Sequence, residues 1–244
     1  MSYQNKVALV TGANRGIGAA ITRELLKSNV AKVYATARRA DSLPHFGDSR
    51  VVPLQLDVTS DTSVANAIHA AKDVDILINN AGTMAYGNWI DSAQDVIEAD
   101  MNTNFYGTLR VTRAFLPQFT SRGSGTIANV VSIVGLAPVP LLAGYSASKA
   151  ALQSFTQSLR GTLAKSGITV LGIYPGPVDT DLAKGIPLAK EQPEVVAAKI
   201  IQGIAESQSY IFPDAMALQV ELLWASNGRE LEVALRAAEE GAAA

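Results

Sequence analysis

Residues 6–18 read KVALVTGANRGIG, a short apolar run followed by a glycine-rich turn that opens a helical pattern. Glycines permit a tight turn and close approach of the backbone to a pyrophosphate, and a helix N-terminus offers free N–H groups and the positive end of its dipole. Glycines alone would also suit an ordinary turn, but here a strand precedes them and a helix follows, as phosphate binding requires. The stretch therefore predicts a dinucleotide site that includes Gly12, Asn14, Arg15, Gly16, Ile17 and Gly18.

The rest of the chain repeats this alternation of short apolar runs and longer helical patterns. Strands are predicted at residues 6–10, 32–36, 51–55, 75–78, 126–131 and 169–174. Helices are predicted at residues 16–28, 60–71, 92–119 with a break near Pro117, and 144–165. Such runs fit strands covered on both faces, so the alternation predicts a single α/β domain over residues 1–244, a Rossmann-type doubly wound parallel sheet with helices on both faces. Ligands of these sheets bind at the carboxyl ends of the strands.

Composition narrows the expected partner to a small molecule. A net charge of −2, with no run of like charges, argues against nucleic acid or an anionic membrane. The chain has no cysteine, and His45 and His69 lack metal-binding spacing, so no metal site is expected. The sequence shows neither a signal-peptide pattern nor an apolar stretch long enough to span a membrane, which predicts a cytoplasmic protein; its alanine-rich end, residues 241–244, is expected to be frayed.

The residues after the second predicted strand bear on which dinucleotide is bound. Arg38 and Arg39 stand where NAD-binding proteins of this fold present an acid to the adenosine ribose, and no carboxylate occurs between Glu24 and Asp41. An arginine can hold a 2′-phosphate through two hydrogen bonds, and Arg15 can approach it from the glycine loop. Two solvated arginines are the alternative interpretation. We predict NADP(H) rather than NAD(H), with Arg38 as a contact.

Tyr145 and Lys149 are four residues apart, which on a helix places them on the same face. A tyrosine titrates near pH ~10, and a cation about 4 Å away would stabilise its phenolate by up to about 4 kcal/mol, which brings the pKa toward neutrality. An exposed pair at this spacing is also common by chance, so the pair gains meaning from the motifs upstream. With them, it predicts a catalytic proton donor.

Taken in order, the motifs resemble those of the short-chain dehydrogenase/reductase superfamily over roughly residues 5–180. They are the glycine loop at 12–18, Asp57 with Val58, the run from Asn79 to Gly82, Asn104, Ser132, Tyr145 with Lys149, and residues 175–180. The resemblance implies further cofactor contacts, from Asp57 and Val58 to the adenine, from Asn80, Ala81 and Gly82 around the ribose, and from Val178 and Thr180 to the nicotinamide carboxamide.

Four residues would carry the chemistry: Asn104, Ser132, Tyr145 and Lys149. The Ser132 hydroxyl would donate a hydrogen bond to a substrate carbonyl oxygen while Tyr145 protonates the developing alkoxide. Lys149 would lower the pKa of Tyr145 and hold the nicotinamide ribose, and Asn104 would anchor a water that reconnects Lys149 with solvent. A buried asparagine that kinks a helix would look the same in sequence.

Substrate choice is expected from residues 83–89, 133–143 and 181–190. The second of these segments is almost wholly apolar and carries no charge, so it either lines an apolar pocket or packs against a neighbouring subunit. Because it offers no cation to a carboxylate, we predict a neutral ketone or aldehyde as substrate, with alcohols oxidised in reverse. The loop at 181–192 is short, which predicts an open site.

These features predict an NADPH-dependent carbonyl reductase/alcohol dehydrogenase. The alternatives are a 3-oxoacyl carrier-protein or hydroxysteroid reductase and, outside enzymes, a dinucleotide-binding redox sensor. Residues 209–240 depart from the glycine-rich last strand that many family members have, which puts the tetramer interface built from that strand in doubt. Pairing through the two long helices at 92–119 and 144–165 is compatible with a homodimer or a homotetramer.

Overall fold

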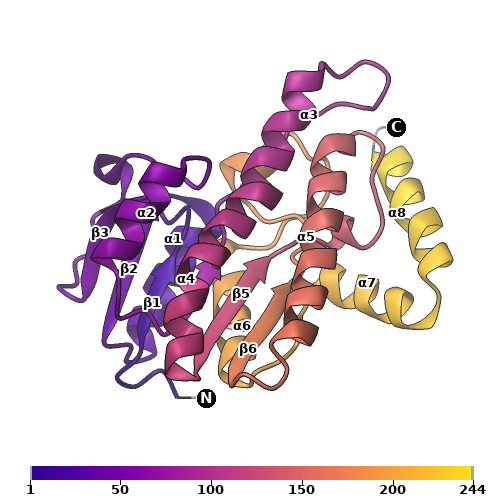
Figure 1. Ribbon diagram of the computed structural model, residues 1–244. Coiled ribbons are helices and arrows are strands. Elements are labelled where there is room, and N and C mark those ends of the chain that lie inside the picture. The colour runs from indigo at the N-terminus through magenta and orange to yellow at the C-terminus, as the bar shows by residue number, and fades with distance from the viewer. Residues whose placement is uncertain (1, 243–244) are drawn as a thin grey trace.

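Seven strands form one parallel sheet in the computed structural model of the protein, which describes residues 2–242 (Figure 1). Their order across the sheet is β3-β2-β1-β4-β5-β6-β7, and every neighbouring pair is parallel. The strands are β1 (Val7–Val10), β2 (Lys32–Ala37), β3 (Val51–Gln55), β4 (Ile76–Asn79), β5 (Gly125–Val130), β6 (Ile168–Ile173) and β7 (Tyr210–Ile211). The order reverses between β1 and β4, which confirms the doubly wound sheet and places the ligand-binding crevice at their carboxyl ends.

Helices cover both faces of the sheet, as the fully buried central strands β1 and β4 require. In Figure 1, α2, α4 and α5 lie in front of the sheet and α1 and α6 behind it. The main helices are α1 (Gly16–Lys27), α2 (Asp61–Ala70), α3 (Gln94–Asp100), α4 (Thr108–Arg122), α5 (Ala143–Thr162), α6 (Pro193–Ala205), α7 (Ala215–Ser226) and α8 (Gly228–Ala242). Short 3₁₀ turns occupy Ala40–Ser42, Ile133–Gly135 and Asp181–Ala183. Two apolar clusters, one on each side, fill the space between helices and sheet.

The predicted break near Pro117 is wrong, because α4 continues through it to Arg122. Pro117 is exposed, while Phe115 and Phe119 on the opposite side are fully buried against the sheet. Their packing outweighs the single backbone hydrogen bond that the proline removes. The irregular part of this long helix is instead the π-helical segment η2 (Met101–Gly107), which joins α3 to α4.

The chain after β7 forms two helices at the outer edge of the sheet, α7 and α8. The ring of Phe212 stacks on Tyr174 with 5.0 Å between centroids, and Trp224 of α7 lies 5.3 Å from the ring of Tyr210. These contacts belong to a third apolar cluster, which the alternation of strands and helices did not predict. Of the tail predicted to be frayed, residues 241–242 are the last residues of α8, and positions 243–244 lie outside the described residues.

Asp214 fixes α7 to the segment that follows β6. One carboxylate oxygen caps α7 by accepting from the backbone N–H of Ala217 at 2.8 Å, and the other accepts from the N–H of Gly176 at 2.8 Å. The side chain is buried, so both N–H groups would lose their acceptor in an Asp214→Ala variant. We expect that variant to lower the free energy of unfolding by about 2 kcal/mol, measured by denaturant unfolding.

The matched control is Ser60→Ala. Ser60 caps α2 through one hydrogen bond, from the N–H of Ser63 at 3.2 Å, so its loss should cost about 1 kcal/mol. Equal costs for the two variants would show that the bond from Gly176 to Asp214 contributes nothing to stability.

Candidate active site

A cavity of about 790 Å³ runs along the carboxyl ends of the strands, from the glycine loop after β1 to the C-terminal helices. Most of the residues that the sequence assigned to cofactor and catalysis line it together. They are Gly12, Asn14, Arg15, Gly16, Ile17, Arg38, Asp57, Val58, Asn80, Ala81, Gly82, Ser132, Tyr145, Lys149, Val178 and Thr180. The two predicted residues outside the lining are Gly18 and Asn104, which lie behind it.

The glycine loop is locked to the loop after β4. Gly12 has φ +64°, and a Cβ there would lie 2.9 Å from the Cα of Ala81. A Cβ on Gly18 would overlap the carbonyl oxygen of Gly12, so the absence of a side chain at Gly18 lets α1 pack directly against the glycine loop. The Thr11 hydroxyl oxygen accepts from the N–H groups of Asn80 and Ala81 at 2.9 Å each. Thr11 was missed from the sequence, where only its place at the end of β1 could have marked it.

The start of α1 is suited to a pyrophosphate. The N-cap residue, Arg15, makes no side-chain capping bond, so the first N–H groups of the helix face the loop without a side-chain acceptor. Gly16 has φ +52°, and a Cβ there would lie 3.0 Å from the Thr180 side chain. The cradle therefore has room for backbone and ligand but little for a side chain, which is the arrangement a dinucleotide phosphate needs.

The basic residues at this end are exposed and partly engaged with acids. Arg38 lies on the cavity wall, and its neighbour Arg39 approaches Asp41 at 3.5 Å. The Arg15 guanidinium donates to Asp181 at 3.0 Å, across the cavity from the glycine loop to the segment after β6. Arg15 would have to leave Asp181 to meet a 2′-phosphate, and a surface ion pair of this kind is weak enough to exchange.

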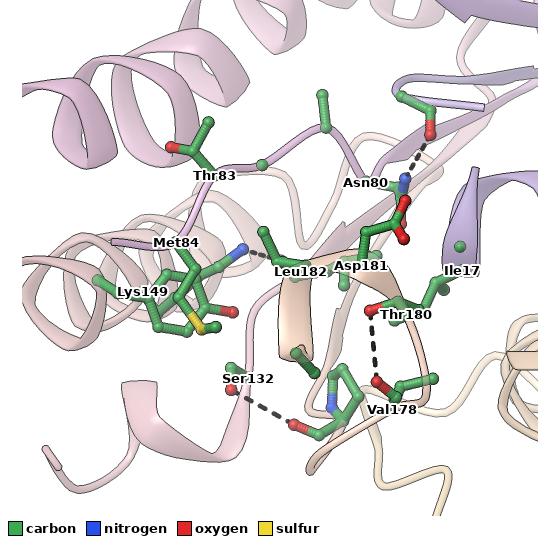
Figure 2. Close-up of a pocket in the computed structure, with 18 of the residues that line it drawn as sticks. Ile17, Asn80, Thr83, Met84, Ser132, Lys149, Val178, Thr180, Asp181 and Leu182 are labelled. Carbon is green, nitrogen blue, oxygen red and sulfur yellow. Dashed lines mark hydrogen bonds between the residues drawn. The ribbon is translucent and has the colours of Figure 1, made fainter. Parts of the chain in front are cut away.

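The adenine and nicotinamide candidates lie on two separate turns of the wall. Asp57 accepts from the N–H of Thr59 at 2.9 Å, which fixes the turn after β3 and leaves Val58 buried against Gly107. Val178 and Thr180 lie on the segment after β6, where the Thr180 hydroxyl donates to the Val178 carbonyl at 3.3 Å. Figure 2 shows this pair close to Ile17 of the glycine loop.

Tyr145 and Lys149 lie on the first half of α5, and Ser132 follows β5. Their exposed fractions are 9%, 4% and 7%, so the alternative of a solvated surface pair is wrong. The Lys149 ammonium donates to the Val130 carbonyl at 2.8 Å and lies 5.6 Å from the centre of the Tyr145 ring. In Figure 2, Ser132 and Lys149 face the same space, with Asn80 and Ile17 on its far side.

The predicted lowering of the Tyr145 pKa is wrong for the site as it stands. Burial raises the pKa of Tyr145 to about 12, opposed by a hydrogen bond with Ser132 and assisted by the Asp100 carboxylate. Burial also lowers the pKa of Lys149 to about 8, against the attraction of Asp100. The cost of removing a phenolate from water therefore exceeds what the hydrogen bond with Ser132 returns. At neutral pH the phenol keeps its proton.

Asn104 is fully buried in η2 and makes three hydrogen bonds to protein. Its amide nitrogen donates to the Thr83 carbonyl and the Ser148 hydroxyl, and its oxygen accepts from the Thr83 N–H, all at 2.9 Å. One turn earlier, the buried Asp100 carboxylate accepts from the Thr83 hydroxyl at 2.8 Å and from the N–H of Ala85 at 3.2 Å. Asn104 thus lies buried in an irregular helix, as the alternative of a buried asparagine that kinks a helix predicted. Asp100 is a neighbour that the sequence analysis missed.

The family to which the chain belongs follows from a comparison with known proteins. The model of the short chain dehydrogenase family matches residues 6–191, about three quarters of the chain. This chain is a short-chain dehydrogenase/reductase. It is 38% identical over 194 residues to an uncharacterized oxidoreductase of Staphylococcus saprophyticus, covering 75% of this chain and 82% of the relative. The protein is therefore an oxidoreductase of this family.

Two solved structures extend the likeness beyond the sequence match. A short chain dehydrogenase from Burkholderia cenocepacia, in complex with NADP, superimposes with a TM-score of 0.91 at 34% identity and covers 96% of this chain and 99% of its own. A 3-ketoacyl-(acyl-carrier-protein) reductase from Brucella melitensis, complexed with NADH, has a TM-score of 0.78 at 26% identity and covers 85% and 93%. The fold of this short-chain dehydrogenase/reductase is thus shared over nearly its whole length.

The far end of the cavity in this short-chain dehydrogenase/reductase is apolar. Residues 133–143 contribute Ile133, Val134, Val139, Leu141 and Leu142 to its wall, which supports the pocket interpretation of that segment. The family match ends at residue 191, yet the lining continues to Met216 of α7 and to Leu235 and Ala238 of α8. The sequence analysis missed these three residues, which lie in the segment 209–240 that departs from the family pattern.

The described residues also bear on two expected absences. Across residues 2–242, no helix combines the length and apolar character needed to cross a membrane. Within the same part of the chain, no group of acidic, histidine or cysteine side chains is placed to hold a metal ion.

Proposed function

We propose that this short-chain dehydrogenase/reductase uses NADPH to reduce a neutral ketone or aldehyde to an alcohol, and catalyses the reverse oxidation. The observation that carries the proposal is the single cavity that joins the glycine cradle at one end to Ser132, Tyr145 and Lys149 at the other. A cofactor held by the first group and a substrate held by the second would meet within it.

The cofactor would lie along the wall that the structure describes. The glycine loop and the start of α1 would hold its pyrophosphate, Asp57 and Val58 the adenine, Asn80 to Gly82 the ribose, and Val178 and Thr180 the carboxamide. Arg38, with Arg15, would hold a 2′-phosphate, a preference supported by the missing carboxylate after β2 and by the NADP in the Burkholderia structure. NADPH supplies the hydride when it is bound.

The protein supplies orientation and the proton. The Ser132 hydroxyl would donate to the carbonyl oxygen, and Tyr145, protonated because burial raises its pKa, would transfer its phenolic proton to the developing alkoxide. The Lys149 ammonium would stabilise the phenolate so formed and hold the ribose. Asn104 would anchor the water through which that proton is replaced.

A neutral substrate is supported by the lining beyond Tyr145. The side chains that residues 133–143, α7 and α8 contribute to it carry no charge: Ile133, Val134, Val139, Leu141, Leu142, Met216, Leu235 and Ala238. A 3-oxoacyl carrier-protein reductase is a second candidate, favoured by the likeness to the Brucella enzyme. A hydroxysteroid reductase would also suit an apolar wall, whereas a sensor without activity would not need Tyr145 and Lys149. We further propose that the protein acts as a homodimer or homotetramer in the cytoplasm.

The test is reduction of a panel of neutral ketones and aldehydes, from small aliphatic to bulky aromatic, with NADPH and with NADH. We expect loss of NADPH absorbance with several members of the panel and slower loss with NADH. Binding of NADPH without turnover of any member would contradict the reductase and favour a sensor.

A further inference from the structure

The substrate end of the cavity is covered by two helices from the end of the chain. Met216 lies in the first turn of α7, and Leu235 and Ala238 lie on α8, and all three line the same cavity as Ser132 and Tyr145. Leu182 and Ile186 approach from the segment after β6. We call Met216, Leu235 and Ala238 the roof.

The roof is held in place by packing on both helices. Leu231 and Leu235, one turn apart on α8, are 0% and 8% exposed and join the same apolar cluster as Val134 and Leu142. Ala238 follows on the same face, three residues beyond Leu235. Figure 1 shows α8 standing at the edge of the molecule beside the loop that precedes α5. The position of α8 is therefore coupled to the wall of the cavity.

The start of α7 is held separately, by a carboxylate. Asp214 accepts from the N–H groups of Ala217 and of Gly176, and Gly176 itself lines the cavity. Met216 packs against Gly176, where an added Cβ would lie 3.3 Å from the Met216 Cβ, so its place relative to the segment after β6 is fixed. Hydrogen bonds to Asp214 and apolar packing of α8 therefore hold the roof over the cavity.

We propose that the roof selects carbonyl compounds that carry a bulky apolar body, an aryl or extended alkyl group, which lies between the reacting carbonyl and Leu235. This inference rests on the proposed reductase function and specifies its substrate. Apolar surface gains free energy when it leaves water in proportion to the area buried, and a short ketone would leave the roof without a partner. A charged body would lose its hydration against Met216 and Leu235 without an opposite charge.

The experiment compares Leu235→Trp and Ala238→Trp with Val233→Trp. The first two place an indole in the cavity, and because Ala238 is exposed, its replacement does not depend on repacking the core. Val233 is 56% exposed on the other side of α8, which makes it the matched control. For a bulky aryl ketone with NADPH we expect kcat/KM to fall about tenfold or more in both roof variants, with about twofold change or less for a short aliphatic ketone and for the control.

Two results would contradict the proposal that the roof selects bulky substrates. One is an equal change in kcat/KM for bulky and short ketones in both roof variants, and the other is a selectivity change in the Val233 variant as large as theirs. Thermal unfolding of each variant identifies a protein that has lost its fold.

Binding separates this inference from the proposed function. Calorimetric titration of the NADPH-loaded protein with the aryl ketone measures the contribution of the roof to ketone affinity, independently of turnover. If no ketone is reduced, the reductase proposal fails; tighter binding to wild type than to both roof variants would still support the roof. Equal binding to all four proteins would overturn it.

Discussion

Tyr145→Phe should reduce turnover of every carbonyl substrate by about 10²–10⁴-fold while leaving the affinity for NADPH within about twofold. The substitution removes one oxygen and keeps the ring that packs beside Lys149. Because burial raises the pKa of this phenol to about 12, the group is protonated at neutral pH and ready to donate. No water can replace it easily at a position that is 9% exposed. Steady-state reduction rates and fluorescence titration with NADPH measure the two quantities.

The control for this variant is Tyr174→Phe. Tyr174 is a fully buried tyrosine whose hydroxyl is hydrogen-bonded to Gln153 and lies outside the cavity lining. Its loss should lower stability and leave kcat near the wild-type value, which separates a catalytic oxygen from a structural one. A Tyr145→Phe enzyme that kept a tenth of its activity would contradict the proton-transfer mechanism.

The fold could be predicted from the sequence because its signals are local. Six short apolar runs that alternate with four longer helical patterns indicate a parallel sheet covered by helices, and right-handed crossovers leave few possible strand orders. Pro117 was misread for the opposite reason. Its local propensity indicates a break, but Phe115 and Phe119 hold the helix on the sheet through contacts with residues far away in the sequence. β7, with two residues, was too short to give a periodic signal.

The residues of the candidate site likewise divide into those that local sequence spacing reveals and those that depend on distant contacts. Tyr145, Lys149 and the glycines were found because their spacing within one turn or one helix is visible in the sequence. Asp100 and Leu235 were missed because each acquires meaning only from a distant segment: Asp100 from Thr83, and Leu235 from Val134. The direction of the Tyr145 pKa was wrong because charge spacing is readable from the sequence, whereas the burial that outweighs it is a property of the folded chain.

Arg38→Asp should change the ratio of kcat/KM with NADPH to that with NADH by about 100-fold in favour of NADH. Arg38 lines the cavity after β2, where a 2′-phosphate would accept charge-assisted hydrogen bonds worth about 1.5–3 kcal/mol, or roughly 10–100-fold in affinity. The new carboxylate would repel that phosphate and accept hydrogen bonds from the ribose hydroxyls of NADH. Both effects act on the same ratio, which initial rates with each cofactor measure directly.

The control is Arg113→Asp, an identical change of charge at an exposed position of α4 outside the cavity lining. It should leave the ratio unaltered, because surface charges separated by more than the screening length contribute little to binding. Arg15 tests the same site from the other side, since its guanidinium is already shared with Asp181 and must exchange one anion for another. Its replacement should therefore change the ratio less than that of Arg38. An Arg38→Asp enzyme with the wild-type ratio would mean that the arginines after β2 are solvated and that the protein does not distinguish the two cofactors there.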